Sequence, residues 1–146
     1  MSKTNLKIKD KYELYFKCGG LCSICCESLD YDKFSRSEIS VKEYAHIIAD
    51  SENGTRGSSE SAKYNGDINN IILLCPTCHT RVDKDKRLDF YTIEKLHSIK
   101  ESHEQRVREQ LSSLKNKQAL VVKYTAKIGD NQPTILDNQI DEVVRE

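Results

Sequence analysis

The chain has 146 residues, of which 37% are hydrophobic and 32% charged, and 23 Lys and Arg residues balance 23 Asp and Glu residues. No apolar run reaches the roughly 20 residues that a membrane-spanning helix requires, and the first residues lack the apolar stretch of a secretory signal, so we expect a cytoplasmic protein without a membrane span. A net charge of zero disfavours a strongly basic protein that coats nucleic acid, although local basic patches remain compatible with it.

Hydrophobic patterning predicts a helix and then a strand in the first third of the chain. Apolar side chains predict a short amphipathic helix over residues 8–17, which a Gly-Gly pair would end. This face would consist of Ile8, Tyr12, Tyr15 and Phe16. Alternation over residues 41–49 predicts a strand. The polar stretch 50–67 is rich in Gly, Ser and Asn, so we expect a loop, and a loop of that length in a small domain is usually functional or disordered.

A second strand and two helices are expected next. The apolar run within residues 69–74 is short enough for a buried strand, and Pro76 suits the first turn of a short helix that continues to about Lys84. A long helix is predicted over residues 92–115, with an apolar stripe whose average spacing is about 3.5 residues. The stripe consists of Ile93, Leu96, Ile99, His103, Val107, Leu111 and Leu114. It fits packing onto the domain or onto a partner helix, which is compatible with a homodimer.

The last part of the chain has a different character, with a β-like run, a Gly-Asp-Asn turn and an acidic end. A piece of this size cannot bury a core of its own. It either packs back on the domain, pairs with another chain or begins a second domain. We therefore expect residues 1–118 to form one domain and residues 119–146 to be a linker or the start of a further domain.

Six cysteines in a chain without a secretory signal indicate a metal site rather than disulfides. Four of them form two Cys-x-x-Cys pairs, which together supply the four thiolates of a tetrahedral structural Zn²⁺ site. These are Cys22, Cys25, Cys75 and Cys78. Buried or redox-active thiols are the alternative, because the spacer between the pairs is longer than in common short-spacer zinc modules. Cys18 and Cys26 are left over, and Cys26 is the nearest substitute ligand.

Four sequence segments, in this order along the chain, resemble motifs of a known protein family. They are Cys22-Ser23-Ile24-Cys25, Glu43-Tyr44-Ala45-His46-Ile47-Ile48, Gly54-Thr55-Arg56-Gly57 and Asn70-Ile71-Ile72-Leu73-Leu74-Cys75-Pro76-Thr77-Cys78-His79. Over residues 12–104 the chain resembles the HNH endonuclease family, specifically its zinc-stabilised members with an Ala-His-Ile first motif. The resemblance implies an α+β fold with a ββα-metal core, in which a β-hairpin and a helix hold one catalytic divalent cation. The predicted N-terminal helix and long C-terminal helix would flank this core.

The resemblance also implies roles for three residues. His46 would be the general base, since an imidazole that titrates near neutrality can take a proton from water when a carbonyl or carboxylate holds its second nitrogen. Asn70 would orient the His46 segment, and His79 would ligate the catalytic cation, Mg²⁺ or another divalent ion. The less specific alternatives are a hydrogen-bonded structural His46, a turn residue at Asn70 and a zinc ligand at His79.

The sequence departs from the wider family at Ala45, where an acidic or His ligand is usual. Asp83 is a candidate replacement, because it lies four residues after His79 on the same helical face. Glu43 is a second candidate. The identity and the affinity of the cation therefore stay open.

Basic residues near the predicted site are candidate phosphate contacts. Arg81, Lys84 and Arg87 follow the second cysteine pair and would flank a bound phosphate backbone. Arg56 in the polar loop is a further candidate, although exposed loop charges are more often simply solvated.

Together these features predict a metal-dependent endonuclease that cleaves double-stranded DNA with low sequence specificity, because no dedicated base-reading module is evident. A zinc-stabilised DNA-binding module that does not cleave is one alternative, and a dimerisation unit of a larger defence protein is another. Members of the Ala-His-Ile subgroup are similar to nuclease domains that precede a ligand-sensing domain in bacterial anti-phage systems. The resemblance thus implies antiviral defence and a C-terminal sensor domain.

Overall fold

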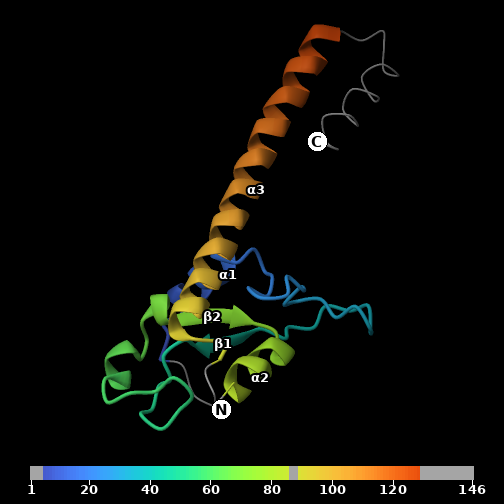
Figure 1. The fold of residues 1–146 in the computed structure, drawn as a ribbon. Coiled ribbons are helices and arrows are strands. Elements are labelled where there is room, and N and C mark those ends of the chain that lie inside the picture. Colours follow the sequence, from blue (N-terminus) through green and yellow to red (C-terminus); the bar gives the residue numbers. More distant parts are fainter. Residues whose placement is uncertain (1–4, 86–88, 129–146) are drawn as a thin grey trace. The chain divides into compact units, whose positions relative to one another are not determined.

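The computed structural model describes residues 5–85 and 89–128, with three α-helices and one two-stranded antiparallel sheet among them (Figure 1). The chain divides into two compact units, Met1–Val107 and Arg108–Glu146, and every candidate site residue that the structure describes lies in the first. The elements are α1 (Ile8–Lys17), β1 (Glu43–His46), β2 (Ile71–Leu74), α2 (Pro76–Lys84) and α3 (Ile93–Ile128). None of the described helices has the length and apolar character needed to cross a bilayer.

The two strands pair so that Glu43 lies opposite Leu74 and His46 opposite Ile71. All four residues of β2 are buried, whereas Ala45 is the one buried residue of β1. Strand β1 is shorter than the predicted 41–49. After His46 the strands share one more backbone hydrogen bond, from Ile47 N to Asn70 O at 2.8 Å. At Ile48 the side chain of Asn70 replaces the backbone as the hydrogen-bond partner.

Helix α1 has the predicted bounds but buries a different face. Leu14 is its one buried residue, and Cys18 directly after the helix is buried as well. By contrast, Ile8, Tyr12 and Phe16 are all more than 70% exposed. Of the predicted apolar stripe only Tyr15 packs against the core, because the aliphatic Leu14 and the small Cys18, one helical turn apart, fill the space beside the sheet.

The core joins the sheet to the helices of the first unit. Its largest fully buried side chains include Leu29, Ile47, Val82, Leu96 and His103. Ring atom Nε2 of His103 hydrogen-bonds the Cys18 carbonyl oxygen at 2.9 Å, so the first turns of α3 are fixed next to the end of α1. The predicted packing of His103 is therefore observed.

The prediction that the long helix ends near residue 115 is wrong for the residues that the structure describes. Helix α3 continues through Ile128, and residues 129–146 lie outside the described part of the chain. The predicted β-like run, residues 120–124, is therefore helical, and it follows Lys117, Gln118 and Ala119, of which Ala is the strongest helix former and Lys and Gln are good ones. Extending an existing helix needs no new nucleus, so this local preference for strand is overcome. The division into a domain over residues 1–118 and a linker or further domain over residues 119–146 stays a prediction.

Candidate metal centre and active site

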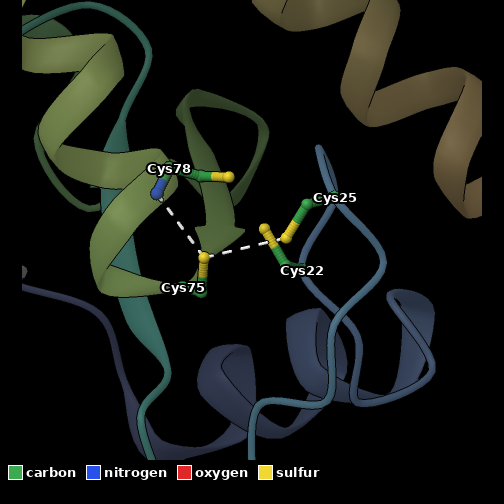
Figure 2. A group of neighbouring side chains, drawn as sticks. All are labelled: Cys22, Cys25, Cys75 and Cys78. Carbon is green, nitrogen blue, oxygen red and sulfur yellow. Dashed lines mark hydrogen bonds between the residues drawn. The ribbon is translucent and has the colours of Figure 1, made fainter.

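The two Cys-x-x-Cys pairs meet in space. The four sulfur atoms of Cys22, Cys25, Cys75 and Cys78, here called the cysteine cluster, all lie within 4.8 Å of one another (Figure 2). A tetrahedral Zn²⁺ with Zn–S bonds of about 2.3 Å would place its sulfur ligands about 3.8 Å apart. The Sγ atoms of Cys25 and Cys75 are 3.8 Å apart. The cysteine cluster therefore fits a structural zinc ion.

Local backbone structure presents the four thiols. Cys22 and Cys25 lie in a turn closed by the antiparallel bridge between Leu21 and Ser28. Ser23 N in this turn donates to Leu73 O at 3.0 Å, which ties the turn to β2. Cys75 is the N-cap of α2, so the second pair enters the helix directly after the same strand. Strand β2 thus aligns both halves of the site.

The two remaining cysteines lie outside this group. Cys26 is exposed, has a left-handed φ of 59° and is not one of the four residues of the cysteine cluster. Cys18 is buried and its thiol donates to Tyr15 O at 3.2 Å. Burial raises the pKa of the Cys18 thiol, which suits a packing role. His79 is not part of the cysteine cluster either, so the alternative in which it replaces a cysteine finds no support.

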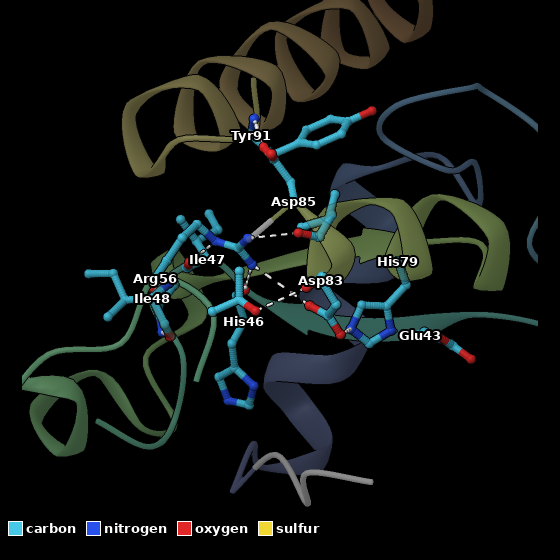
Figure 3. Close-up of polar contacts among 12 residues, drawn as sticks. Glu43, His46, Ile47, Ile48, Arg56, His79, Asp83, Asp85 and Tyr91 are labelled. Atoms are coloured by element: carbon cyan, nitrogen blue, oxygen red, sulfur yellow. Dashed lines mark hydrogen bonds and ion pairs between the residues drawn. The ribbon is translucent and has the colours of Figure 1, made fainter. Parts of the chain in front are cut away.

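His79 instead contacts both carboxylates that were candidates for the missing ligand. Nδ1 of His79 lies 2.5 Å from Oε2 of Glu43 on β1, and Nε2 lies 3.2 Å from Oδ2 of Asp83, one turn later on α2 (Figure 3). We call these three residues the His79 cluster. The imidazole is partly exposed, with 27% of its side chain accessible. The two carboxylates lie at opposite ring nitrogens, and among the described residues only the cysteine cluster converges on one point.

Strand geometry explains why Glu43 reaches the helix. Residues two apart on a strand share a face, so Glu43 and Ala45 lie on one face of β1. Ala45 is 1% exposed and leaves no ligand at its own position. Glu43, at the start of the strand, brings a carboxylate to His79 on α2.

Asn70 fixes the backbone directly after His46. Its Oδ1 accepts from Ile48 N at 2.8 Å, and its Nδ2 donates to Ile48 O at 2.9 Å. Asn70 is 3% exposed and lies at the end of a short 3₁₀ turn, Ile68–Asn70, that leads into β2. The side chain therefore acts as a positioning group for the segment that follows β1.

His46 lies at the end of β1, where burial lowers the pKa of its imidazole. The charges of Asp50 and Asp83 oppose this shift and that of His79 adds to it, so His46 lies within electrostatic range of the His79 cluster. The imidazole is thus neutral at neutral pH and can accept a proton. Its Nε2 is buried and, among the described residues, has no hydrogen-bond partner, so the expected orienting carbonyl or carboxylate is not found at that nitrogen.

Arg56 corrects a prediction, because it is 6% exposed rather than a surface phosphate contact. Its guanidinium donates to Ile47 O at 2.7 Å, to Val82 O at 2.9 Å and to His46 O at 3.3 Å, and it lies 3.8 Å from Oδ1 of Asp83. Arg56 therefore joins the end of β1 to the end of α2. These bonds hold it at a left-handed φ of 62°, an unfavourable backbone region for a residue other than glycine.

The glycines beside Arg56 allow this arrangement. A Cβ at Gly57 would lie 2.3 Å from Ser51 O, so only glycine fits against the loop backbone there. Thr55 Oγ1 donates to Asp83 O at 3.0 Å and adds a second link to α2. The sequence analysis did not predict that Arg56 is a buried structural residue. Its position between two glycines in a polar loop could have indicated a tightly folded segment.

The remaining basic candidates lie on or after α2. Arg81 and Lys84 are exposed on the helix, and Arg87 lies outside the described residues. A comparison with protein-family models finds none that matches the chain, and a comparison with curated proteins finds no match. The function therefore has to be inferred from the geometry of the site.

Proposed function

We propose that the protein is a metal-dependent endonuclease of the HNH type, which hydrolyses phosphodiester bonds of double-stranded DNA with low sequence specificity. The observation that carries this proposal is the His79 cluster. Both carboxylates that could replace the ligand missing at Ala45 contact His79, and β1, β2 and α2 follow one another in the order of a ββα unit. The family resemblance supplies the reaction class.

His46 supports the proposal through its protonation state. Hydrolysis of a phosphodiester requires removal of a proton from the attacking water. Burial lowers the pKa of His46, so the base form is present at neutral pH. Asn70 and Arg56 hold the backbone on either side of the imidazole, through Ile48 and through the His46 carbonyl. They are positioning residues, because their bonds go to backbone atoms.

A divalent cation would be held by Nε2 of His79 together with Asp83. In that arrangement Glu43 accepts a hydrogen bond from Nδ1–H, which fixes the ring orientation, as carboxylates commonly do for metal-bound His. The cation, when bound, supplies Lewis acidity at the scissile phosphate. Two protein ligands hold an ion weakly, so the activity should depend on added cation.

A DNA-binding module that does not cleave is the second candidate. It is favoured by one observation, since the three groups of the His79 cluster do not converge on a common point in the described part of the chain. The resemblance further suggests a role as the nuclease part of a larger defence effector. Exposed Leu111 and Leu114 on α3 are compatible with pairing of two copies.

A plasmid-nicking assay with zinc-loaded protein and a panel of divalent cations separates the two candidates. We expect nicking with at least one cation and a loss of about 10²–10⁴-fold in His46→Ala, since general-base catalysis contributes about that much. His97→Ala is the matched control, because it removes an imidazole on α3 that makes no described contact with the site. DNA binding without nicking under every cation would favour the non-catalytic module.

A further inference from the structure

Two neighbouring aromatic residues lie between α2 and α3, apart from the His79 cluster. The rings of Phe90 and Tyr91 meet edge to face, with centroids 4.9 Å apart. Oδ2 of Asp85 accepts from Tyr91 N at 2.6 Å (Figure 3) and from Phe90 N at 3.2 Å, so the backbone that carries both rings is fixed. Phe90 is nevertheless 59% exposed. The structure therefore holds an aromatic surface in place and leaves it open to solvent.

Two depressions share this aromatic pair. The larger, of about 900 Å³, is lined on α2 by Thr77, Thr80, Arg81 and Lys84. The smaller, of about 330 Å³, is lined on α3 by side chains that include Lys95 and Arg106. Phe90 and Tyr91 line both. We call the two depressions and the rings that they share the aromatic groove.

Both depressions of the aromatic groove are lined by basic side chains. Nζ of Lys95 lies 5.5 Å from the centre of the Phe90 ring, within the range of a cation–π contact. Asp85 is the one acidic side chain among the described lining residues, and its Oδ2 already accepts from the backbone N–H groups of Phe90 and Tyr91. The groove therefore suits a polyanion that also offers flat apolar faces.

We propose that the aromatic groove binds unpaired nucleotides of single-stranded DNA. Bases would stack on the exposed ring of Phe90, while phosphates would pair with Arg81 and Lys84 in one depression and with Lys95 and Arg106 in the other. A duplex hides its base faces within its own stack, so an exposed aromatic surface contributes to binding only where bases are unpaired. The inference narrows the substrate of the proposed nuclease to double-stranded DNA that carries an unpaired segment and, in that respect, rests on the proposed function.

The aromatic groove and the His79 cluster use different faces of α2. Successive residues of an α-helix are rotated by about 100°, so Arg81 and Lys84 lie roughly 150° around the helix axis from His79 and Asp83. A single strand in the groove would thus leave the His79 cluster unoccupied. Substrates with an unpaired segment, such as nicked, flapped or unwound DNA, would be held by this contact.

Binding can be measured without cleavage, using zinc-loaded protein and no other divalent cation. Fluorescence anisotropy would compare a labelled oligo-dT of about 12 nucleotides with a duplex of about 12 base pairs, lengths that span a single-strand site. Phe90→Ala should weaken binding of the single strand by roughly 5- to 150-fold, because a stacked base contributes about 1–3 kcal/mol. Binding of the duplex should change less than about twofold.

Matched variants separate base stacking on Phe90 from the loss of any exposed ring and from the loss of any positive charge. Phe34→Ala removes a ring that is 86% exposed on a different loop, and it should leave both affinities unchanged. Phe90→Leu keeps apolar bulk without an aromatic face and should resemble Phe90→Ala, which also covers the case in which the alanine variant folds poorly. Arg81→Ala should reduce the salt dependence of single-strand binding by about 0.7 in the log–log slope, whereas Lys9→Ala on α1 should not.

The outcomes are distinct for the groove and for the proposed catalysis. Equal losses of single-strand and duplex binding in Phe90→Ala, or no single-strand binding by the wild type, would overturn the groove proposal whether or not plasmids are nicked. Tighter binding of an RNA strand of the same length would overturn the assignment to DNA. Single-strand binding that depends on Phe90, in a protein that nicks nothing, would support the groove and contradict the nuclease.

Discussion

Two groups of candidate metal ligands use adjacent residues of α2, yet they differ in how their ligand atoms are arranged. Cys78 contributes to the cysteine cluster, where four sulfur atoms lie within 4.8 Å of one another. His79 contributes to the His79 cluster, where each ring nitrogen already contacts a carboxylate. A rotation of about 100° per residue sends the two side chains to different sites. One short helix thus serves both groups.

This difference predicts two kinds of metal dependence. The cysteine cluster converges on one point and supplies a full tetrahedral set of soft ligands, which is typical of a permanent structural ion. In the His79 cluster each ring nitrogen of His79 already contacts a carboxylate oxygen, so the three side chains lie together without a metal. Loss of metal should therefore affect folding at the first group and activity alone at the second.

The largest effect is expected from removal of the zinc. Purified protein should carry about one equivalent of Zn²⁺, and Cys78→Ser should unfold the region around β2 and α2, because structural zinc supplies roughly 10–16 kcal/mol in zinc-finger peptides. Colorimetric zinc analysis and circular dichroism would measure both. Cys26→Ser is the matched control, since Cys26 is exposed and outside the cysteine cluster. A zinc-free protein that stays folded in a chelator would contradict the prediction.

A smaller loss of stability is expected from Arg56→Ala. This change leaves three backbone carbonyls at the ends of β1 and α2 without their charged donor, so the free energy of unfolding should fall by about 1–3 kcal/mol for each carbonyl that stays buried without a partner. Urea unfolding would measure it. Arg36→Ala is the control, because Arg36 also has a positive φ of 54° but is exposed, and it should change stability by less than about 0.5 kcal/mol. Equal effects of the two substitutions would contradict a specific role for Arg56.

The comparison also shows what the sequence could predict. The cysteine cluster was predictable, because paired Cys-x-x-Cys spacing already specifies a complete ligand set. The β1, β2 and α2 order was predictable as well, from alternation, an apolar run and Pro76. The short length of β1 was not, since it depends on the side chain of Asn70 replacing the ladder at Ile48.

The burial of Arg56 illustrates a limit of sequence analysis. A charged residue in a polar loop is normally solvated, and its burial depends on carbonyl groups that approach only in the folded chain. Leu14 is a second example, since periodicity alone selected the face of α1 that contains Tyr12 and Phe16. Glu43 was a candidate ligand from its place in the sequence, whereas its contact with Nδ1 of His79 depends on how β1 and α2 lie together in the fold.

The dependence of nicking on cation concentration would show whether the His79 cluster holds the catalytic ion. His79→Ala should eliminate activity or raise the half-saturating cation concentration most. Asp83→Asn should raise the half-saturating cation concentration less. Glu43→Gln should raise it least and by well under the roughly 10–100-fold that complete loss of such an outer hydrogen bond typically costs in metal affinity, because Gln still offers an oxygen to Nδ1–H. Zinc content should be unchanged in all three. Superimposable titrations for His79→Ala and the wild type would remove His79 from the site.

The smallest effect is expected from the titration of His46. Burial lowers the pKa of its imidazole below the usual 6.5, so between the two values the unfolded chain binds more protons than the folded one. The stabilisation is therefore complete above about pH 6.5 and is lost as the pH falls through the folded-state pKa. Urea unfolding at pH 7.5, 6.5 and 5.5 should show a steeper loss of stability for the wild type than for His46→Gln, in which this group no longer titrates. Zinc content has to be measured at each pH, because protonation of thiolates also releases metal. Parallel stability curves for the two proteins would contradict a lowered pKa at His46.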